Sequence, residues 1–226
     1  MNETPKPNND ALPPSAMRTD YKLGRLSDQE AGDNPFSLFD RWFKQAVDAS
    51  TGPIFEPNVM TLATSTPDGI PDARIVLLKG YSEAGFTFFT NYDSAKGRQL
   101  EANPNAALVL HWIALERQIR INGTVTKTSA TESDAYFATR PRESQLGAWV
   151  SNQSQPTTAH ALESEMARLT AEHEGRVVPR PPHWGGFIVA PKRIEFWQGR
   201  PGRLHDRILF DRKTEKNNWS RSRLAP

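Results

Sequence analysis

Residues 58–79 decide the fold class of this chain and read N-V-M-T-L-A-T-S-T-P-D-G-I-P-D-A-R-I-V-L-L-K. Two runs rich in apolar and β-branched residues, 58–66 and 72–79, flank the sequence P-D-G-I-P. Proline, aspartate and glycine in that order are typical of a tight turn between two strands. The stretch therefore predicts an antiparallel β-hairpin.

The remaining elements extend this pattern, with helices inserted between groups of strands. Asn34 and Pro35 suit the start of a helix, and its apolar face would carry Phe36, Phe39, Trp42, Phe43, Ala46 and Val47. Further helices are expected after Ser94, from Ser129 towards Arg140, from Pro141 and over 157–173. Further strands are expected over 86–90, 106–112, 117–126, 185–190, 193–197 and 207–211. We therefore predict an α+β protein, an antiparallel β-barrel with peripheral helices.

Composition excludes several classes of function. The 226 residues include no cysteine, which rules out disulfides, thiol nucleophiles and thiolate metal sites. The five histidines form no H-x-x-x-H pattern, so a dedicated metal site is not expected. A formal net charge of only +2 argues against a general nucleic-acid binder. Neither G-x-G-x-x-G nor a P-loop sequence occurs, so no Rossmann site or P-loop is indicated.

The start of the chain differs from its middle. The first 16 residues are rich in proline and asparagine and predict a disordered tail. They lack the basic region and apolar core of a signal peptide, and no apolar run in the chain approaches the roughly 18 residues of a membrane span. A cytoplasmic protein is therefore expected. On these patterns alone, residues 17–24, M-R-T-D-Y-K-L-G, are interpreted as further linker.

Two groups of residues in the middle of the chain could bind anions. Arg74 and Lys79 lie five apart in one strand and would point to opposite faces, either as solvated edge residues or as ligands of two different anions. Tyr136 and Arg140 would share a helix face, and Ser144 would follow in the first turn of the next helix. The second group predicts either a phosphate cradle or a surface arginine beside an aromatic ring.

A third candidate is R-L-H-D-R, residues 203–207. In an extended chain Arg203, His205 and Arg207 would face one way. Three cationic or titratable groups on one face repel one another unless an anion lies between them. The pattern therefore favours an anionic ligand, either a small molecule or a phosphodiester backbone.

These residues are arranged as in a known family. From about Arg18 to the C-terminal R-L-A-P, the sequence closely resembles the pyridoxamine/pyridoxine 5'-phosphate oxidase family. The resemblance rests on R-I-V-L-L-K, F-F-T-N, P-R-E-S-Q-L-G-A-W-V-S-N-Q-S, I-E-F-W-Q-G and R-L-H-D-R, in the family's order and approximate spacing. It implies an FMN-binding split-barrel domain over 17–226, with C-terminal strands over 207–226, and a homodimer that holds flavin in clefts between its subunits.

The resemblance also implies roles for individual residues. The flavin contacts would be Arg74, Ile75, Val76, Leu77, Leu78, Lys79, Phe89, Thr90, Lys96, Gln118, Gln153, Ser154, Trp197 and Arg207. The substrate phosphate would be held by Lys79, Tyr136, Arg140 and Ser144, and the catalytic residues against the substrate pyridine ring would be Arg203 and His205. Arg18 and Tyr21 would belong to a mobile lid, residues 17–24, which reverses the interpretation of that segment as linker.

The implied reaction is the oxidation of pyridoxamine or pyridoxine 5'-phosphate to pyridoxal 5'-phosphate, a step of vitamin B6 salvage. Hydride would pass from C4' of the substrate to N5 of FMN. Molecular oxygen would reoxidise the flavin and give hydrogen peroxide, and the amine substrate would release ammonia. Arg203 would steer the reacting group, whereas a role of His205 as a base stays open. Arg200 has no role in this scheme and is expected to be solvated.

Two positions depart from the family pattern. After the serine that follows F-F-T-N, here Ser94, the family often has arginine and then lysine, both near the flavin phosphate. In this chain Ala95 replaces the arginine, and Lys96 follows it. We expect a weaker phosphate contact or compensation by Arg98, one helical turn away. In the lid, Asp20 stands where relatives often have glutamate, so its carboxylate has a shorter stem.

Two other functions remain compatible with these patterns. A different split-barrel flavin reductase or oxidase would share the scaffold, and fold alone would not distinguish it. A β-barrel nucleic-acid-binding protein would use the basic cluster, would be colourless and would bind oligonucleotides in a salt-sensitive way. The oxidase is favoured, because the phosphate cradle and the R-L-H sequence together suit a phosphorylated pyridine.

Overall fold

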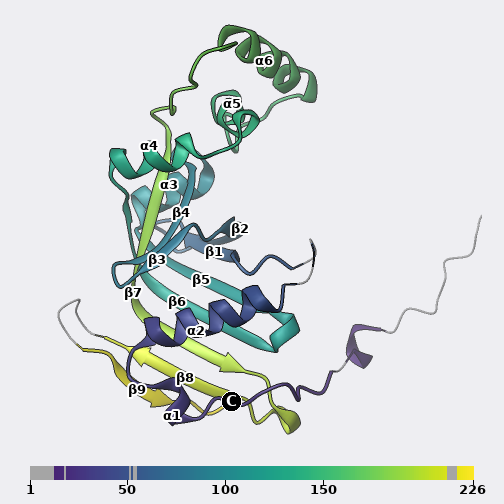
Figure 1. The fold of residues 1–226 in the computed structure, drawn as a ribbon, viewed down its shortest axis with the longest axis vertical. Helices are drawn as coiled ribbons and strands as arrows, with labels where there is room; N and C mark the ends of the chain where they lie inside the picture. The colour runs from purple at the N-terminus through teal and green to yellow at the C-terminus, as the bar shows by residue number, and fades with distance from the viewer. Residues whose placement is uncertain (1–12, 18, 51, 53–54, 213–217) are drawn as a thin grey trace, which may run out of the picture.

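A curled antiparallel sheet forms the body of the protein, with helices across one face and at one end (Figure 1). The structure is a computed structural model that describes residues 13–17, 19–50, 52, 55–212 and 218–226. In these residues the strands are β1 (Val59–Ser65), β2 (Pro71–Leu77), β3 (Gly80–Ser82), β4 (Gly85–Asn91), β5 (Asn105–Trp112), β6 (Arg117–Lys127), β7 (Trp184–Gln198), β8 (Asp206–Asp211) and β9 (Ser220–Arg223). The α-helices are α1 (Asp28–Ala31), α2 (Pro35–Asp48), α3 (Ala95–Ala102), α4 (Ala130–Ala138), α5 (Arg142–Val150) and α6 (Ala159–Glu172). Among the described residues no helix has the length and apolar character needed to cross a membrane.

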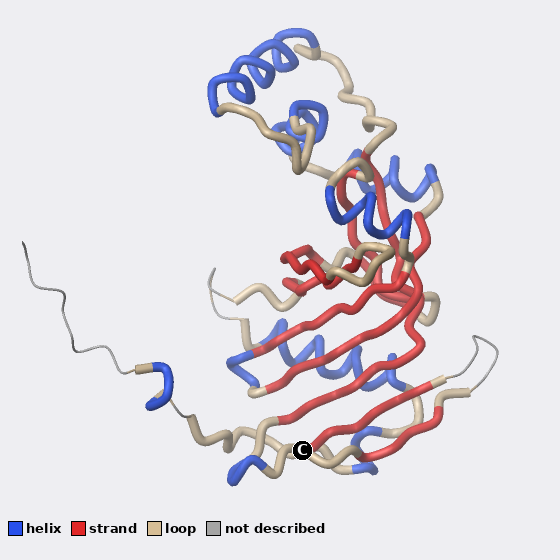
Figure 2. The backbone as a smooth tube through the Cα atoms, turned by 180° about the vertical axis from the view of Figure 1, so that it is seen from behind, coloured by secondary structure: helices blue, strands red, loops and turns tan. Residues whose placement is uncertain are grey.

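Strand β7 is the long central strand of the sheet. It pairs with β6 along its length, and on its other side it pairs first with β4 and then with β8. Every pairing is antiparallel, and the main path runs β2-β1-β5-β6-β7-β4-β3. Figure 2 shows the strands side by side in a sheet that curves along its length. The expected α+β fold with an antiparallel split barrel and peripheral helices is confirmed.

Helix α2 fills the inside of the curl. It begins after Asn34, whose side-chain oxygen accepts hydrogen bonds from two backbone N–H groups of the first turn. Phe39 and Trp42 are buried beneath it, and the Trp42 ring meets Phe196 of β7 edge-on with ring centroids 5.3 Å apart. Val47 was expected on the same buried face but is 50% exposed, whereas Ala46 beside it is fully buried, so the buried face of the last turn is narrower than predicted.

A second, smaller core joins α4, α5 and α6 at one end of the sheet (Figure 1). A capping box between Ser129 and Glu132 begins α4, as predicted. Pro141 separates α4 from α5, and Trp184 at the start of β7 packs into the cluster. This arrangement fixes the turn between α4 and α5 against the first residues of β7.

The helices and strands differ from prediction in two respects. Residues 185–190 and 193–197 are one strand, because β7 accommodates Lys192 as an extra, unpaired residue where Asn122 and Gly123 of β6 pair with Arg193 and Pro191. The two short elements α1 and β3 were not predicted, since three or four residues carry too little periodic pattern.

The sequence R-L-H-D-R is extended only at Asp206 and Arg207, the first residues of β8, so the condition for a shared face is not met. Pro201–Arg203 form a 3-10 turn, and Arg203 adopts a left-handed φ of 61°. The three side chains therefore do not share one strand face. In the expected disordered tail, Pro14–Ala16 form a short 3-10 turn, and residues 1–12 lie outside the described residues.

Gly97→Ala should unfold the protein more easily, because α3 packs closely on the end of β4. A Cβ at Gly97 would lie 1.9 Å from the backbone oxygen of Tyr92, which cannot move independently. We expect the free energy of unfolding to fall by about 3 kcal/mol in chemical denaturation. Gly80→Ala is the matched control, since its nearest neighbour would be a Thr87 carbon at 3.9 Å, and it should cost less than about 1 kcal/mol. Equal losses in both variants would contradict the close approach.

Candidate active site

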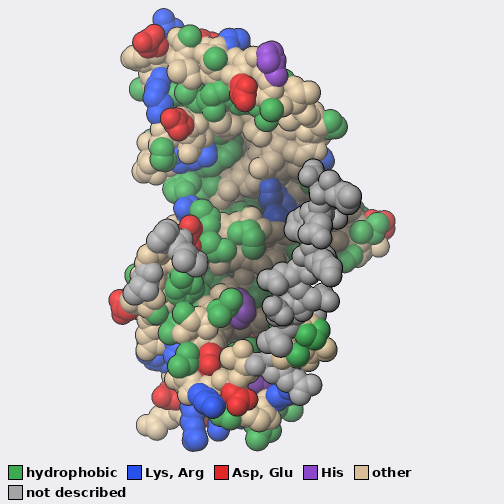
Figure 3. All heavy atoms as spheres, turned by 90° about the vertical axis from the view of Figure 1, so that its right-hand side faces the viewer, with side chains coloured by type: hydrophobic (Ala, Val, Ile, Leu, Met, Phe, Trp, Pro, Cys, Tyr) green, Lys and Arg blue, Asp and Glu red, His purple; other side chains and the backbone are tan. Residues whose placement is uncertain are grey.

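A hollow of about 620 Å³ opens where β2 and β4 meet α4 and α5. Figure 3 views the molecule from the open side of the curl, where its surface is hollowed between the helical end and the sheet. The predicted residues that line this first hollow are Ile75, Val76, Leu77, Lys79, Phe89, Thr90, Lys96, Tyr136, Arg140, Ser144 and Gln153. Most residues predicted for flavin and for the substrate phosphate are therefore brought together.

The first hollow is cationic. The described residues that line it include Lys79, Lys96 and Arg140 but no aspartate or glutamate. Three positive charges in a confined space attract an anion. Nowhere among the described residues do three or more histidine, aspartate or glutamate side chains gather to hold a metal ion.

Lys96 lies in a polar cluster that lines the first hollow. Its Nζ lies 2.8 Å from Oε1 of Gln153 and 3.2 Å from Oγ1 of Thr90, at the start of α3. Burial, and next the charge of Arg74, lower the pKa of Lys96 to about 8. An anion bound here would stabilise the charged amine, so Lys96 is suited to hold a phosphate.

Arg140 is a second cation that lines the first hollow. Its guanidinium carbon lies 4.5 Å from the centre of the Trp184 ring. One terminal nitrogen, Nη1, is buried and has no hydrogen-bond partner among the described residues. Burial lowers the pKa of this guanidinium. A buried donor left unpaired costs about 1–3 kcal/mol, so the free protein is poised to gain a ligand oxygen here.

Aromatic rings and a helix start complete the first hollow. Phe89 stacks on Tyr136 with ring centroids 4.0 Å apart and on Trp184 at 5.6 Å. Ser144 lies in the first turn of α5, whose N-cap, Pro141, makes no side-chain hydrogen bond. The free N–H groups of that turn and the Ser144 hydroxyl suit a phosphate beside Arg140.

A second group of predicted residues lies elsewhere on the sheet. Gln118, Trp197 and Arg207 are register partners across β6, β7 and β8, so they share one face. The Trp197 ring contacts His205 at 4.7 Å and Tyr21 at 5.6 Å between centroids. These aromatic contacts place the N-terminal segment against the predicted catalytic bend.

Beside this row lies a second hollow of about 510 Å³, whose lining includes Tyr21, Arg203 and His205. Arg200 also lines it and is not merely solvated, so that expectation was wrong. Its guanidinium pairs with Asp206 at 3.4 Å, and its backbone N–H donates to Nδ1 of His205 at 3.1 Å. Burial, and then the charge of Arg203, hold the pKa of His205 below its ordinary value.

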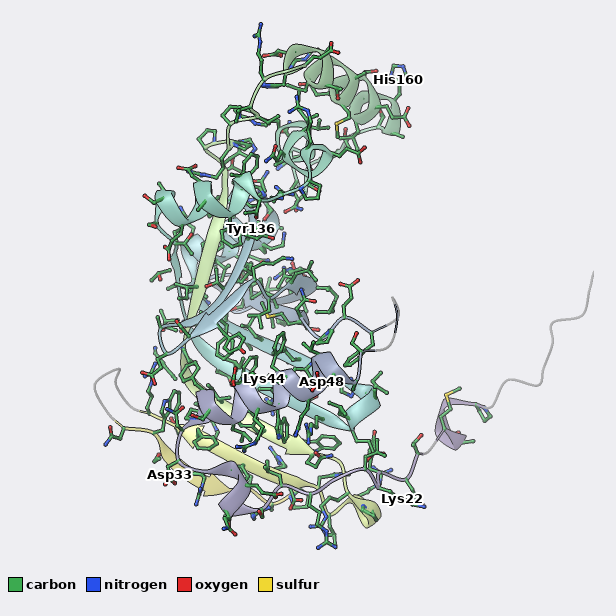
Figure 4. The ribbon with its side chains drawn as sticks, in the orientation of Figure 1. Lys22, Asp33, Lys44, Asp48, Tyr136 and His160 are labelled. Carbon is green, nitrogen blue, oxygen red and sulfur yellow. The ribbon has the colours of Figure 1, made fainter. Side chains whose placement is uncertain are left out.

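The two hollows have no described lining residue in common. Figure 4 shows Tyr136 at the helical end of the molecule and Lys22, next to Tyr21, at the opposite end. One chain therefore presents two separate candidate half-sites, one lined by Arg140 and Ser144 and one lined by Arg203 and His205.

Two family models together match residues 47–226 of the chain. Residues 47–197 match the family model described as pyridoxamine 5'-phosphate oxidase. The chain belongs to this family. Residues 184–226 match a second model, the pyridoxine 5'-phosphate oxidase C-terminal dimerisation region. Arg203 and His205 of this oxidase-family chain fall within that region, whereas Tyr21 of the same hollow lies outside it.

Individual relatives agree with the family assignment. The chain is 55% identical over 215 residues to a pyridoxine/pyridoxamine 5'-phosphate oxidase of Paraburkholderia xenovorans, covering 93% of this chain and 97% of the relative. It is 52% identical over 211 residues to the protein of that name in Burkholderia lata, with the same coverage. Among solved structures, PhzG from Burkholderia lata 383, in complex with tetrahydrophenazine-1-carboxylic acid, superposes with a TM-score of 0.82 at 29% identity. That match covers 90% of this chain and 99% of PhzG.

Three residues that were predicted to contact flavin line neither the first nor the second hollow in this family member: Arg74, Leu78 and Ser154. Arg74 borders Lys96 but hydrogen-bonds to Gln99 and pairs with Asp72. Leu78 is buried in the core. The Ser154 hydroxyl accepts from the backbone N–H of Ala95, at the start of α3.

Three further predictions concern arginines. Arg207 pairs with Glu195 at 2.8 Å, and this carboxylate raises the pKa of Arg207. Arg98, expected to compensate for Ala95, donates instead to the backbone oxygen of Asp93 and lines a neighbouring hollow. Arg18 lies outside the described residues.

Sequence reasoning missed Trp184, which stacks in the first hollow and carries Arg140 on its face. A signal was present in the sequence, since Trp184 precedes Gly185 and Gly186 at the start of a predicted strand. A Cβ at Gly185 would lie 2.1 Å from the Tyr92 hydroxyl. Paired glycines of this kind mark a close approach, and a neighbouring aromatic is then a candidate wall.

Proposed function

We propose that this chain is an FMN-dependent oxidase that converts pyridoxamine or pyridoxine 5'-phosphate to pyridoxal 5'-phosphate. The observation that carries the proposal is the first hollow, which has three cations, no carboxylate in its described lining and an unpaired buried nitrogen on Arg140. Two phosphorylated molecules would occupy it, the cofactor and the substrate. The names of the relatives support the substrate class.

The residues present fit both phosphates. Lys96, Thr90 and Gln153 form a polar cluster suited to the FMN phosphate. Arg140 and Ser144, with Tyr136 and Lys79 in the same hollow, would hold the substrate phosphate. When bound, flavin supplies the two-electron chemistry, and the overall reaction of the amine consumes oxygen and water and releases ammonia and hydrogen peroxide. The protein's task is to align the substrate and exclude water.

A homodimer would complete the active site. Arg203 and His205 lie in a hollow apart from Arg140, so a second copy would have to bring them to the substrate ring. The match of residues 184–226 to a dimerisation region supports this arrangement. The first hollow also continues into an exposed apolar surface, with Ile75 61% and Ile113 75% exposed, and such surfaces are typical of interfaces.

A second candidate is oxidation of a phenazine precursor, favoured by the structural likeness to PhzG. Identity argues for the first candidate, because the chain is 52% identical to the named oxidase of Burkholderia lata and 29% identical to PhzG of the same species. The cationic hollow also suits a phosphate better than the single carboxylate of a phenazine acid.

A product assay tests the proposal. The flavin-loaded protein in air should form pyridoxal 5'-phosphate and hydrogen peroxide from pyridoxamine 5'-phosphate, and unphosphorylated pyridoxamine should react far more slowly. Tetrahydrophenazine-1-carboxylic acid is the competing substrate. Faster oxidation of this compound than of pyridoxamine 5'-phosphate would reverse the order of the two candidates.

FMN affinity should fall as the pH rises through about 8, because Lys96 has a pKa of about 8 in the free protein. Below that pH the amine is charged and pairs with phosphate at no protonation cost. Above it a proton must be taken up on binding, which weakens affinity by up to about tenfold per pH unit. Titration of flavin-free protein with FMN, followed by fluorescence quenching, measures this slope.

Lys96→Arg is the control, since arginine stays charged throughout this range. It should bind FMN with little dependence on pH between about 7 and 9. A slope in Lys96→Arg as steep as in the unchanged chain would show that another group is responsible.

A further inference from the structure

The bend between β7 and β8 fixes the His205 ring through the backbone. Gly202 and Arg203 both adopt left-handed φ values, 64° and 61°, which turn the chain back on itself. As a result, the backbone N–H of Arg200 donates to Nδ1 of His205 at 3.1 Å. A backbone N–H can only donate, so Nδ1 must present a lone pair. In the neutral ring, the proton is therefore on Nε2.

The surroundings also favour the neutral ring. His205 packs against Trp197 at 4.7 Å and Tyr21 at 5.7 Å between ring centroids. Burial, and then the charge of Arg203, hold its pKa below the ordinary value. A proton on Nδ1 would also face the N–H of Arg200 and break the hydrogen bond.

The other charged groups that line the second hollow do not reverse the preference of His205 for its neutral form. Arg200 from the bend adds a further cation, and Asp20 from the N-terminal segment is the one carboxylate among the described lining residues. The neighbouring carboxylate of Asp206 is occupied, since it pairs with Arg200 at 3.4 Å and with Arg223 at 2.8 Å. It also accepts the backbone N–H of Leu26 at 3.0 Å.

We propose that His205 is a fixed, neutral hydrogen-bond donor that points Nε2–H at an acceptor atom of the substrate and takes up no proton during the oxidation. A general base needs a free lone pair directed at the substrate. Here the lone pair on Nδ1 is engaged by Arg200, and Nε2 carries the hydrogen. The backbone N–H of Arg200 is thus the positioning group for this residue. The inference rests on the proposed function, because it places the substrate against Arg203 and His205.

The tautomer can be observed directly by nitrogen NMR of the flavin-loaded protein with ¹⁵N-labelled histidine. His205→Gln identifies the His205 signals by their loss. Between about pH 6.5 and 8, Nδ1 should resonate as an unprotonated nitrogen and Nε2 as a protonated one. A proton on Nδ1 in that range would overturn the proposal. This readout does not depend on turnover, so it stands even if pyridoxamine 5'-phosphate proves not to be the substrate.

Kinetics separates a donor from a base. Glutamine keeps an N–H near the position of Nε2 and cannot act as a base, so His205→Gln should keep kcat/KM within about tenfold and retain the pH profile. Leucine has no hydrogen-bond donor, so kcat/KM of His205→Leu should be about tenfold lower than that of His205→Gln. A catalytic base would instead cost about 10²- to 10⁴-fold in both variants.

His160→Gln on α6, at the far end of the molecule in Figure 4, is the matched control and should be unchanged. The flavin content of each variant reports whether it has folded. A loss beyond 100-fold in flavin-loaded His205→Gln would overturn the proposal. Absence of oxidation by the unchanged chain would instead refute the proposed function.

Discussion

Arg203→Ala should bind FMN as the unchanged chain does and lose about 100-fold in kcat/KM for pyridoxamine 5'-phosphate. The side chain is exposed in the second hollow and lies apart from the Lys96 cluster, so its removal leaves the proposed flavin phosphate site intact. The bend also holds Arg203 at a left-handed φ, which costs a non-glycine residue about 1 kcal/mol. A strained, exposed arginine fits a role in function better than one in packing.

Arg203→Lys separates charge from shape. Lysine keeps the positive charge but lacks the planar guanidinium that can lie over a ring. If Arg203 steers the reacting group by packing on the pyridine, Arg203→Lys should lose nearly as much as Arg203→Ala. Steady-state kinetics with flavin absorbance on the same samples measures both effects. Unchanged kcat/KM in Arg203→Ala, or a colourless protein, would contradict this role.

Arg140→Ala should raise KM for the phosphorylated substrate and lower kcat/KM by about 100-fold, with a smaller effect on kcat. The buried Nη1 of Arg140 would pair with a phosphate oxygen, and truncating one partner of such a pair costs about 3 kcal/mol. Unphosphorylated pyridoxamine cannot use that contact, so its slow oxidation should be almost unaffected. The ratio of kcat/KM for the two substrates is the measurement.

Arg168→Ala is the matched control, because this arginine on α6 pairs with Glu165 and Glu172 in solvent. Arg168→Ala should keep the ratio of kcat/KM for the two substrates that the unchanged chain shows. Equal losses of Arg140→Ala on both substrates would mean that Arg140 supports the fold around Trp184 and does not bind phosphate.

Local features of the fold could be predicted from the sequence, because their causes lie within a few residues. Asn34, Ser94 and Ser129 each cap the helix expected after them. The hairpin over 58–79 also forms as predicted, with Val59 opposite Leu77 and Ser65 opposite Pro71. Capping and turn geometry need no knowledge of distant residues.

Features that depend on distant contacts could not be predicted. The continuity of β7 past Pro191 depends on its pairing with β6, a strand that lies about 70 residues earlier in the chain. The position of Arg140 depends on Trp184, and the role of Arg200 depends on a left-handed residue that is not glycine. Family resemblance named most residues of the first hollow, but the geometry that separates them from Arg203 and His205 required the fold.

The most direct test of the central claim is the absorbance of the flavin-loaded protein without oxygen. On adding pyridoxamine 5'-phosphate under anaerobic conditions, the yellow flavin band should bleach, and it should return when air is admitted. Bleaching shows that the bound flavin accepts electrons from this substrate, which product assays in air show only indirectly. A flavin band that stays unchanged with pyridoxamine and pyridoxine 5'-phosphates, or a purified protein that binds no flavin, would contradict the account.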